Sequence, residues 1–146
     1  MRIDQKDKDV RKSTQNLEFI WKPFYYVDGG NAEIFTHVMA HHYNPDQIFP
    51  TFITDQIVVT SFDQVEQMVP AILDWAKKSD GHYKSKNILM LYGDDFRYKV
   101  PYDNYLNIEW VMNYFNARPE LNKKVKFIYS TPKKYYLPNF PWGISK

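Results

Sequence analysis

The sequence contains no cysteine, which excludes disulfide bonds and thiolate metal sites. It has no apolar run long enough for a membrane-spanning helix, and its charged first residues are not those of a signal peptide. Basic and acidic residues nearly balance, 19 against 17, and the basic ones are scattered. We therefore predict neither a nucleic-acid partner nor a membrane partner. Glycine is also scarce, and Gly29-Gly30 lacks the further glycines of a phosphate-binding loop.

What is present is an aromatic-rich chain of one domain's length. Its 146 residues are 44% hydrophobic and 18% aromatic, a composition that suits a globular protein with a sizeable core. Helical patterning predicts helices over 4–22, over 32–40, after Ser61 and from Asp103 to Pro119. Ser61 and Gln64 form a capping box, and Pro70 is expected to kink or restart the helix that follows. No strand is predicted in the first 60 residues, and residues 43–60 are expected to be irregular.

A short apolar run that ends in two carboxylates is the most informative segment. Residues 88–92 are apolar and are followed by Gly93, Asp94 and Asp95, which predicts a buried strand with an acidic pair at its tip. A second apolar run at 125–129 follows the helix after Asp103. The pattern predicts an α/β fold in which strands near 87–92 and 125–130 are parallel neighbours in a right-handed β-α-β unit. Ligands of parallel α/β sheets and barrels bind at the carboxyl ends of the strands, where this acidic pair lies.

The two adjacent aspartates are expected to play different roles. Neighbouring residues at a strand tip point to opposite sides, so one side chain faces a site and the other a neighbouring loop. A carboxyl group beside a like charge and partly desolvated has a raised pKa, as a general acid needs, and Arg97 would oppose that if it turned inward. The alternative interpretation is an acidic loop that caps the following helix.

Two further sets of residues are candidate sites. His37 and His41, with His42 and Asp46, suggest a metal site, but without an accompanying glutamate a polar surface patch is the favoured interpretation. A set of six aromatic residues suggests a sugar-stacking surface, although core or loop-anchoring roles account for most of them. These are Phe24, Tyr25, Tyr26, Tyr43, Phe49 and Phe52.

The order and spacing of several short motifs resemble glycoside hydrolase family 38, the zinc-dependent retaining α-mannosidases. The similarity covers nearly the whole chain to about Tyr136, and the tail from Leu137 does not follow the pattern. The motifs are Arg2-Ile3-Asp4, residues 17–22, Ile34-Phe35-Thr36-His37, His42-Tyr43-Asn44-Pro45, Asp55-Gln56-Ile57-Val58, Gly93-Asp94-Asp95-Phe96-Arg97-Tyr98 and Ile128-Tyr129-Ser130-Thr131-Pro132.

The resemblance implies a partial α/β barrel, with residues 1–136 belonging to the amino-terminal catalytic domain of the family and 137–146 forming a divergent tail. It implies that Asp95 is the catalytic acid/base. It also implies that Arg2, Tyr43 and Asn44 contact substrate near the bound mannose. The Tyr-Asn-Pro form and the Asp-Gln-Ile-Val stretch are more similar to the lysosomal branch, so a lysosomal or secretory location is expected from resemblance, although that branch commonly carries cysteines in these loops.

The same resemblance implies groups that this chain does not supply. The family's His-x-Asp motif and nucleophilic aspartate match positions upstream of Arg2, and a further zinc-ligating histidine matches a position far downstream. Metal ligands are therefore expected to be absent from this chain, and the rest of the barrel to be missing. The expected function is that of an α-mannosidase fragment, inactive alone, whose full-length enzyme releases mannose from glycoprotein glycans with bound zinc. The alternative is a truncated, non-catalytic remnant that at most binds sugar weakly.

Overall fold

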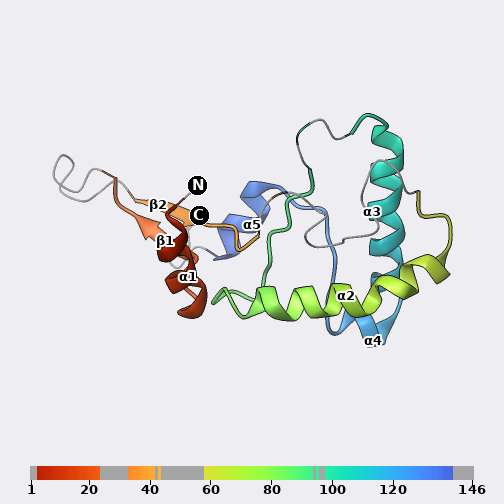
Figure 1. The fold of residues 1–146 in the computed structure, drawn as a ribbon, viewed down its shortest axis with the longest axis horizontal. Coiled ribbons are helices and arrows are strands. Elements are labelled where there is room, and N and C mark those ends of the chain that lie inside the picture. Colours follow the sequence, from red (N-terminus) through yellow and green to blue (C-terminus); the bar gives the residue numbers. More distant parts are fainter. Residues whose placement is uncertain are drawn as a thin grey trace. The chain divides into compact units, whose positions relative to one another are not determined.

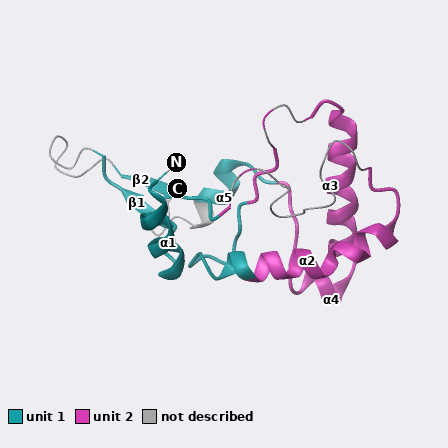
Figure 2. Cartoon of the chain, in the orientation of Figure 1, with its two compact units in different colours: residues 1–40, 78–89, 130–146 teal, residues 41–77, 90–129 magenta. Residues whose placement is uncertain are grey.

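The computed structural model describes residues 3–23, 33–41, 43, 58–93, 95 and 98–139, with side chains described as far as residue 136. Two compact units divide the chain: residues 1–40, 78–89 and 130–146 form unit 1, and residues 41–77 and 90–129 form unit 2 (Figure 2). The elements are helices and two short strands (Figure 1). In order they are α1 Gln5–Ser13, β1 Glu18–Trp21, β2 Ile34–His37, α2 Phe62–Asp80, α3 Pro101–Asn116, α4 Pro119–Asn122 and α5 Pro132–Asn139. None of the described helices is long and apolar enough to cross a membrane.

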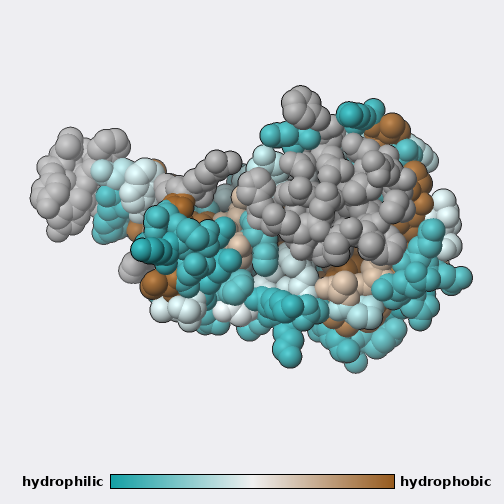
Figure 3. All heavy atoms as spheres, viewed as in Figure 1, coloured by the Kyte–Doolittle hydropathy of each residue, from teal (hydrophilic) through white to brown (hydrophobic). Residues whose placement is uncertain are grey.

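Helix α1 is shorter than the sequence pattern predicted. Asp4 begins it by accepting hydrogen bonds from the backbone N–H groups of Lys6 and Asp7. It ends at Ser13, where the hydroxyl groups of Ser13 and Thr14 both donate to the Val10 carbonyl at 2.8 Å. Such bonds compete with helical ones, and Gln15 then adopts a left-handed conformation with φ 55°. The helix buries no residue, and its surface is mainly hydrophilic (Figure 3).

An antiparallel strand pair lies where no strand was predicted. β1 and β2 pair with Glu18 opposite His37 and Trp21 opposite Ile34. The predicted helix over 32–40 is therefore wrong, because β-branched and aromatic residues in both segments favour a pleated, half-buried surface. Beyond the strands, the Val38 N–H donates to the Leu17 carbonyl at 2.8 Å. The core of unit 1 follows directly and consists of Leu17, Val38, Ala40 and Tyr83.

The core of unit 2 lies between α2, α3 and the residues after α4. Half of the predicted capping box is present, since Ser61 Oγ accepts from the Gln64 N–H at 3.4 Å, while the Gln64 side chain accepts from the Thr60 N–H at 2.8 Å. Helix α2 continues through Pro70 without a restart. α3 begins after Val100 rather than at the predicted cap Asp103, because Pro101 occupies its first turn. The buried members of this core are Val59, Val65, Met68, Ile72, Val111, Tyr114, Phe115 and Leu121. The helices predicted after Ser61 and from Asp103 to Pro119 are thus confirmed as α2 and α3.

The two segments predicted as parallel strands carry no strand. Residues 87–93 and 125–130 have no regular secondary structure, and the described sheet contains β1 and β2 alone. Their backbone groups bond to side chains instead. The Asn116 side chain donates to the Phe127 carbonyl at 2.8 Å and accepts from its N–H at 3.1 Å. The predicted β-α-β unit is therefore wrong for these residues, while the partial α/β barrel remains a prediction.

Candidate functional site

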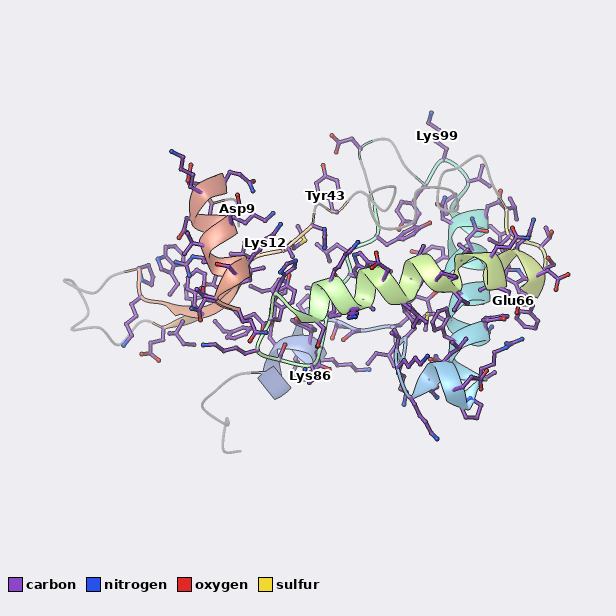
Figure 4. All side chains as sticks on the ribbon, turned by 60° about the horizontal axis from the view of Figure 1, so that its bottom comes forward. Asp9, Lys12, Tyr43, Glu66, Lys86 and Lys99 are labelled. Atoms are coloured by element: carbon purple, nitrogen blue, oxygen red, sulfur yellow. The ribbon has the colours of Figure 1, made fainter. Side chains whose placement is uncertain are left out.

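The structure brings together two of the predicted site residues, both in unit 2. The Tyr43 hydroxyl donates to Asp95 Oδ1 at 3.2 Å, and Asp95 is exposed to solvent. The Gly93 N–H also donates to the Tyr43 carbonyl at 3.3 Å, so backbone and side chain both tie position 43 to the segment before Asp95. Figure 4 shows the Tyr43 side chain projecting from its segment with the hydroxyl at its outer end. The carboxylate is thereby oriented by a neutral donor and remains accessible to a ligand.

Two tyrosines, Tyr92 and Tyr98, flank the turn that carries Asp95 and contact each other. The Tyr98 hydroxyl donates to the Tyr92 carbonyl at 2.6 Å, and the two rings meet edge to face at 6.0 Å. Tyr98 has φ 62°, a left-handed conformation that is uncommon for an aromatic residue. A Cβ atom added at Gly93 would meet nothing within 4 Å, so crowding does not require the glycine. The chain before and after the carboxylate is therefore held by one short hydrogen bond.

The other predicted site residues are not placed. Arg2 and Asn44, predicted to contact substrate, lie outside the described residues, as do Asp94 and Arg97. Most of the aromatic residues proposed as a sugar-stacking surface also lie outside them: Phe24, Tyr25, Tyr26, Phe49 and Phe52. Their roles stay predictions.

The described residues do not fit a zinc ion. No three His, Asp or Glu side chains within the described ranges come together as a metal site would need. His37 lies in a strand rather than on a helix with His41, and its Nδ1 lies 3.0 Å from Glu18 Oε1. His42 is outside the described residues. That zinc ligands come from elsewhere in an active enzyme stays a prediction.

A buried polar cluster in unit 1 was not foreseen from the sequence. Glu18 Oε1 accepts a hydrogen bond from the Tyr135 hydroxyl at 2.9 Å and lies 3.0 Å from His37 Nδ1. Tyr83 stacks on the His37 ring at 5.0 Å, and its hydroxyl accepts from the Ala40 N–H and donates to the Val38 carbonyl. Across the strand pair, Glu18 faces His37, which is why a carboxylate and an imidazole meet in this core.

The ionisation of this cluster follows from its surroundings. Burial alone would raise the pKa of Glu18, but hydrogen bonds from His37 and Tyr135 outweigh burial and hold that pKa below its usual value. Burial, reinforced by the Glu18 charge, raises the pKa of Tyr135. Burial also raises the pKa of Tyr83 to about 12. The Glu18, Tyr83 and Tyr135 side chains are hydrogen-bonded within the cluster, whereas the buried Nε2 of His37 has no hydrogen-bond partner among the described residues.

The Asp95 carboxylate is accessible and accepts a hydrogen bond from the Tyr43 phenol, an arrangement that a general acid or base can use. The profile of the glycosyl hydrolases family 38 N-terminal domain matches residues 1–137. The chain belongs to this family.

Among its relatives, lysosomal alpha-mannosidase of Bos taurus is 28% identical over 156 residues, which cover 99% of this chain and 16% of that protein. An alpha-mannosidase of Arabidopsis thaliana is 30% identical over 153 residues, covering 98% of this chain and 14% of that protein. Lysosomal alpha-mannosidase of Homo sapiens is 26% identical over 151 residues, with 99% of this chain and 14% of that protein covered. The chain therefore spans 14% to 16% of the length of these relatives.

Proposed function

We propose that the enzyme to which these residues belong hydrolyses terminal α-linked mannose of glycans, with Asp95 as general acid and base. The observation that carries the proposal is the hydrogen bond from Tyr43 to the exposed Asp95 carboxyl group, because it joins two residues that family resemblance places at the substrate. Asp95 would protonate the departing glycosidic oxygen and then remove a proton from the attacking water. Tyr43 would keep the carboxyl group turned toward that oxygen.

Retaining hydrolysis requires a second carboxylate about 5 Å from the first, which attacks the sugar carbon from the opposite side. We propose that this nucleophile, like the zinc ligands, matches family positions outside the 146 residues, and that the chain alone is inactive. Lysosomal relatives support a lysosomal or secretory location as part of the same proposal. Mannose-containing glycans are the proposed substrates.

Asp95→Asn in an active preparation of the enzyme tests the proposed acid. Loss of general acid catalysis is expected to lower kcat by about 10²- to 10⁴-fold on a natural glycan, whose leaving sugar needs a proton. An aryl mannoside with a good leaving group needs little protonation, so its first step should be slowed much less. Steady-state kinetics on both substrates measure the difference.

Two control variants separate this role from local disruption. Gly93→Ala should leave both rates nearly unchanged, because a Cβ there meets open space. Asp94→Asn should cost less than Asp95→Asn on both substrates. If Asp94→Asn is the more damaging change and Asp95→Asn is nearly silent, the role belongs to the neighbouring residue. If no active preparation hydrolyses mannosides, the non-catalytic alternative is favoured.

A further inference from the structure

One peptide group close to the candidate acid is held from both sides. The Tyr92 carbonyl accepts a hydrogen bond from the Tyr98 hydroxyl at 2.6 Å. The Gly93 N–H donates to the Tyr43 carbonyl at 3.3 Å. This carbonyl and this N–H belong to the same planar peptide unit, in which the two groups point in opposite directions. A rotation of the unit that breaks one of these hydrogen bonds therefore also disturbs the other.

The Tyr98 hydroxyl is thereby linked to Asp95 through Tyr43. Tyr43 holds the peptide unit with its carbonyl, and its hydroxyl donates to Asp95 Oδ1 at 3.2 Å. All of these residues belong to unit 2. Three hydrogen bonds in series, joined by one peptide unit and one tyrosine, therefore run from Tyr98 to the candidate acid.

Tyr98 is suited to be the fixed end of this series, because both its ring and its backbone are constrained. Its half-buried ring meets the Tyr92 ring edge to face, and it lies 6.0 Å from the Tyr105 ring of α3. Tyr92 in turn packs against the core of unit 2. The φ of 62° at Tyr98 is left-handed, which a bulky residue adopts only where its surroundings enforce it. Backbone strain of this kind is concentrated at functional sites, and here it lies three residues beyond Asp95.

We propose that Tyr98 is a positioning residue for the general acid and base. Its hydroxyl fixes the peptide unit between residues 92 and 93, this unit holds Tyr43, and Tyr43 orients the Asp95 carboxyl group. The inference rests on the proposed function, since the orientation of Asp95 matters only if Asp95 is the acid. A misoriented carboxyl group slows proton transfer without weakening substrate binding, because the group must lie within hydrogen-bond reach of the departing oxygen.

Tyr98→Phe in an active preparation of the enzyme removes the hydroxyl and keeps the ring. We expect kcat on a mannose-terminated glycan to fall about 10-fold with KM nearly unchanged, a smaller loss than removal of the acid itself. On an aryl mannoside with a good leaving group, kcat should fall less than about 3-fold, because that substrate needs little protonation. Tyr102→Phe is the matched control with both rates unchanged, because it removes the hydroxyl of a tyrosine on α3 that is 74% exposed.

The Asp95→Asn background distinguishes positioning from a general structural role. A residue that acts through Asp95 has nothing left to position once the acid is gone, so Tyr98→Phe should then cause no further loss of kcat on the glycan. A merely structural role would lower the rate by the same factor in both backgrounds and on both substrates. Equal losses of that kind would overturn the inference.

Hydrogen exchange in the 146-residue chain tests the same contacts without an activity assay. Tyr98→Phe should accelerate exchange at the Gly93 amide, and Tyr102→Phe should not. Unchanged exchange at Gly93 in Tyr98→Phe would overturn the inference whatever the kinetics show. The two failures are distinguishable: a silent Asp95→Asn overturns the proposed function and the role of Tyr98 with it, whereas a damaging Asp95→Asn beside a silent Tyr98→Phe overturns this inference alone.

Discussion

Glu18 shows how a single carboxylate couples the stability of unit 1 to pH. Its folded-state pKa is held below the ordinary value of 4.5, so the folded protein binds this proton less readily than the unfolded chain. The stabilisation is therefore complete above about pH 4.5 and is lost as the pH falls through the lowered folded pKa. The two hydrogen bonds that cause the shift come from residues 19 and 117 positions away in sequence, so unfolding of unit 1 breaks both.

Glu18→Gln should remove this dependence. Glutamine keeps the shape and one acceptor oxygen but not the charge, so the variant should be less stable at pH 7 by about 1 to 2 kcal/mol, the scale of a charge-assisted hydrogen bond. It should also lose less stability than the parent chain below pH 4.5. Urea unfolding between pH 7 and pH 3 measures both effects. Asp7→Asn is the control, because Asp7 forms an exposed ion pair with Arg11 on α1. If Glu18→Gln loses as much stability below pH 4.5 as the parent chain does, the loss belongs to other carboxylates.

At the scale of elements, the side chain of Asn116 supplies backbone hydrogen bonds that a neighbouring strand was predicted to supply. Asn116, at the end of α3, pairs with both backbone groups of Phe127. Phe127 also packs its ring edge to face against Phe115 at 5.2 Å. The extended segment after α4 is thus fixed to α3 by a side-chain amide and a ring contact.

Asn116→Ala should destabilise unit 2 by about 1 to 3 kcal/mol, because the part-buried N–H and carbonyl of Phe127 would lose their partners. Asn113→Ala, an exposed change on the same helix, should cost no more than a few tenths of a kcal/mol. Chemical unfolding gives the two free energies, and faster amide exchange at Phe127 in Asn116→Ala alone would identify the broken bond. Equal costs for the two variants would contradict the role given to Asn116.

The elements that the sequence predicted correctly are those whose signal is local. The apolar spacing of Val65, Met68 and Ile72 and the capping pair Ser61 and Gln64 lie within one stretch of chain, and α2 forms there. The apolar runs at 88–92 and 125–129 meet one requirement of a buried strand, which is a row of apolar side chains. A strand also needs a neighbouring strand that pairs with its backbone, and a local pattern does not show one. The hydrogen bond between Tyr43 and Asp95 spans 52 positions; the residue pattern singled out the acidic pair, but only family resemblance placed both residues near the substrate. The Glu18 cluster had no local signal at all, since its members come from β1, β2, α5 and, for Tyr83, the segment after α2.

At the scale of the whole molecule, each unit has its own apolar core. Leu17 is fully buried in the core of unit 1, and Phe115 is fully buried in the core of unit 2. The buried members of each core come from one unit alone. Unfolding is therefore expected to disrupt two separate cores. Helix α2 connects the two units along the chain, because its last residues belong to unit 1.

Replacing a buried core residue of one unit by alanine should then destabilise mainly that unit. Leu17→Ala and Phe115→Ala should each cost about 2 to 5 kcal/mol, because each leaves a cavity in a packed core. Hydrogen exchange provides the readout by residue. Leu17→Ala should accelerate exchange at Val38, whose N–H bonds to the Leu17 carbonyl, while leaving Val59, whose N–H bonds to Asn107, nearly as protected as before. Phe115→Ala should do the reverse. If both variants accelerate exchange equally at the two amides, the cores unfold as one cooperative unit, and the division into two would have no energetic counterpart.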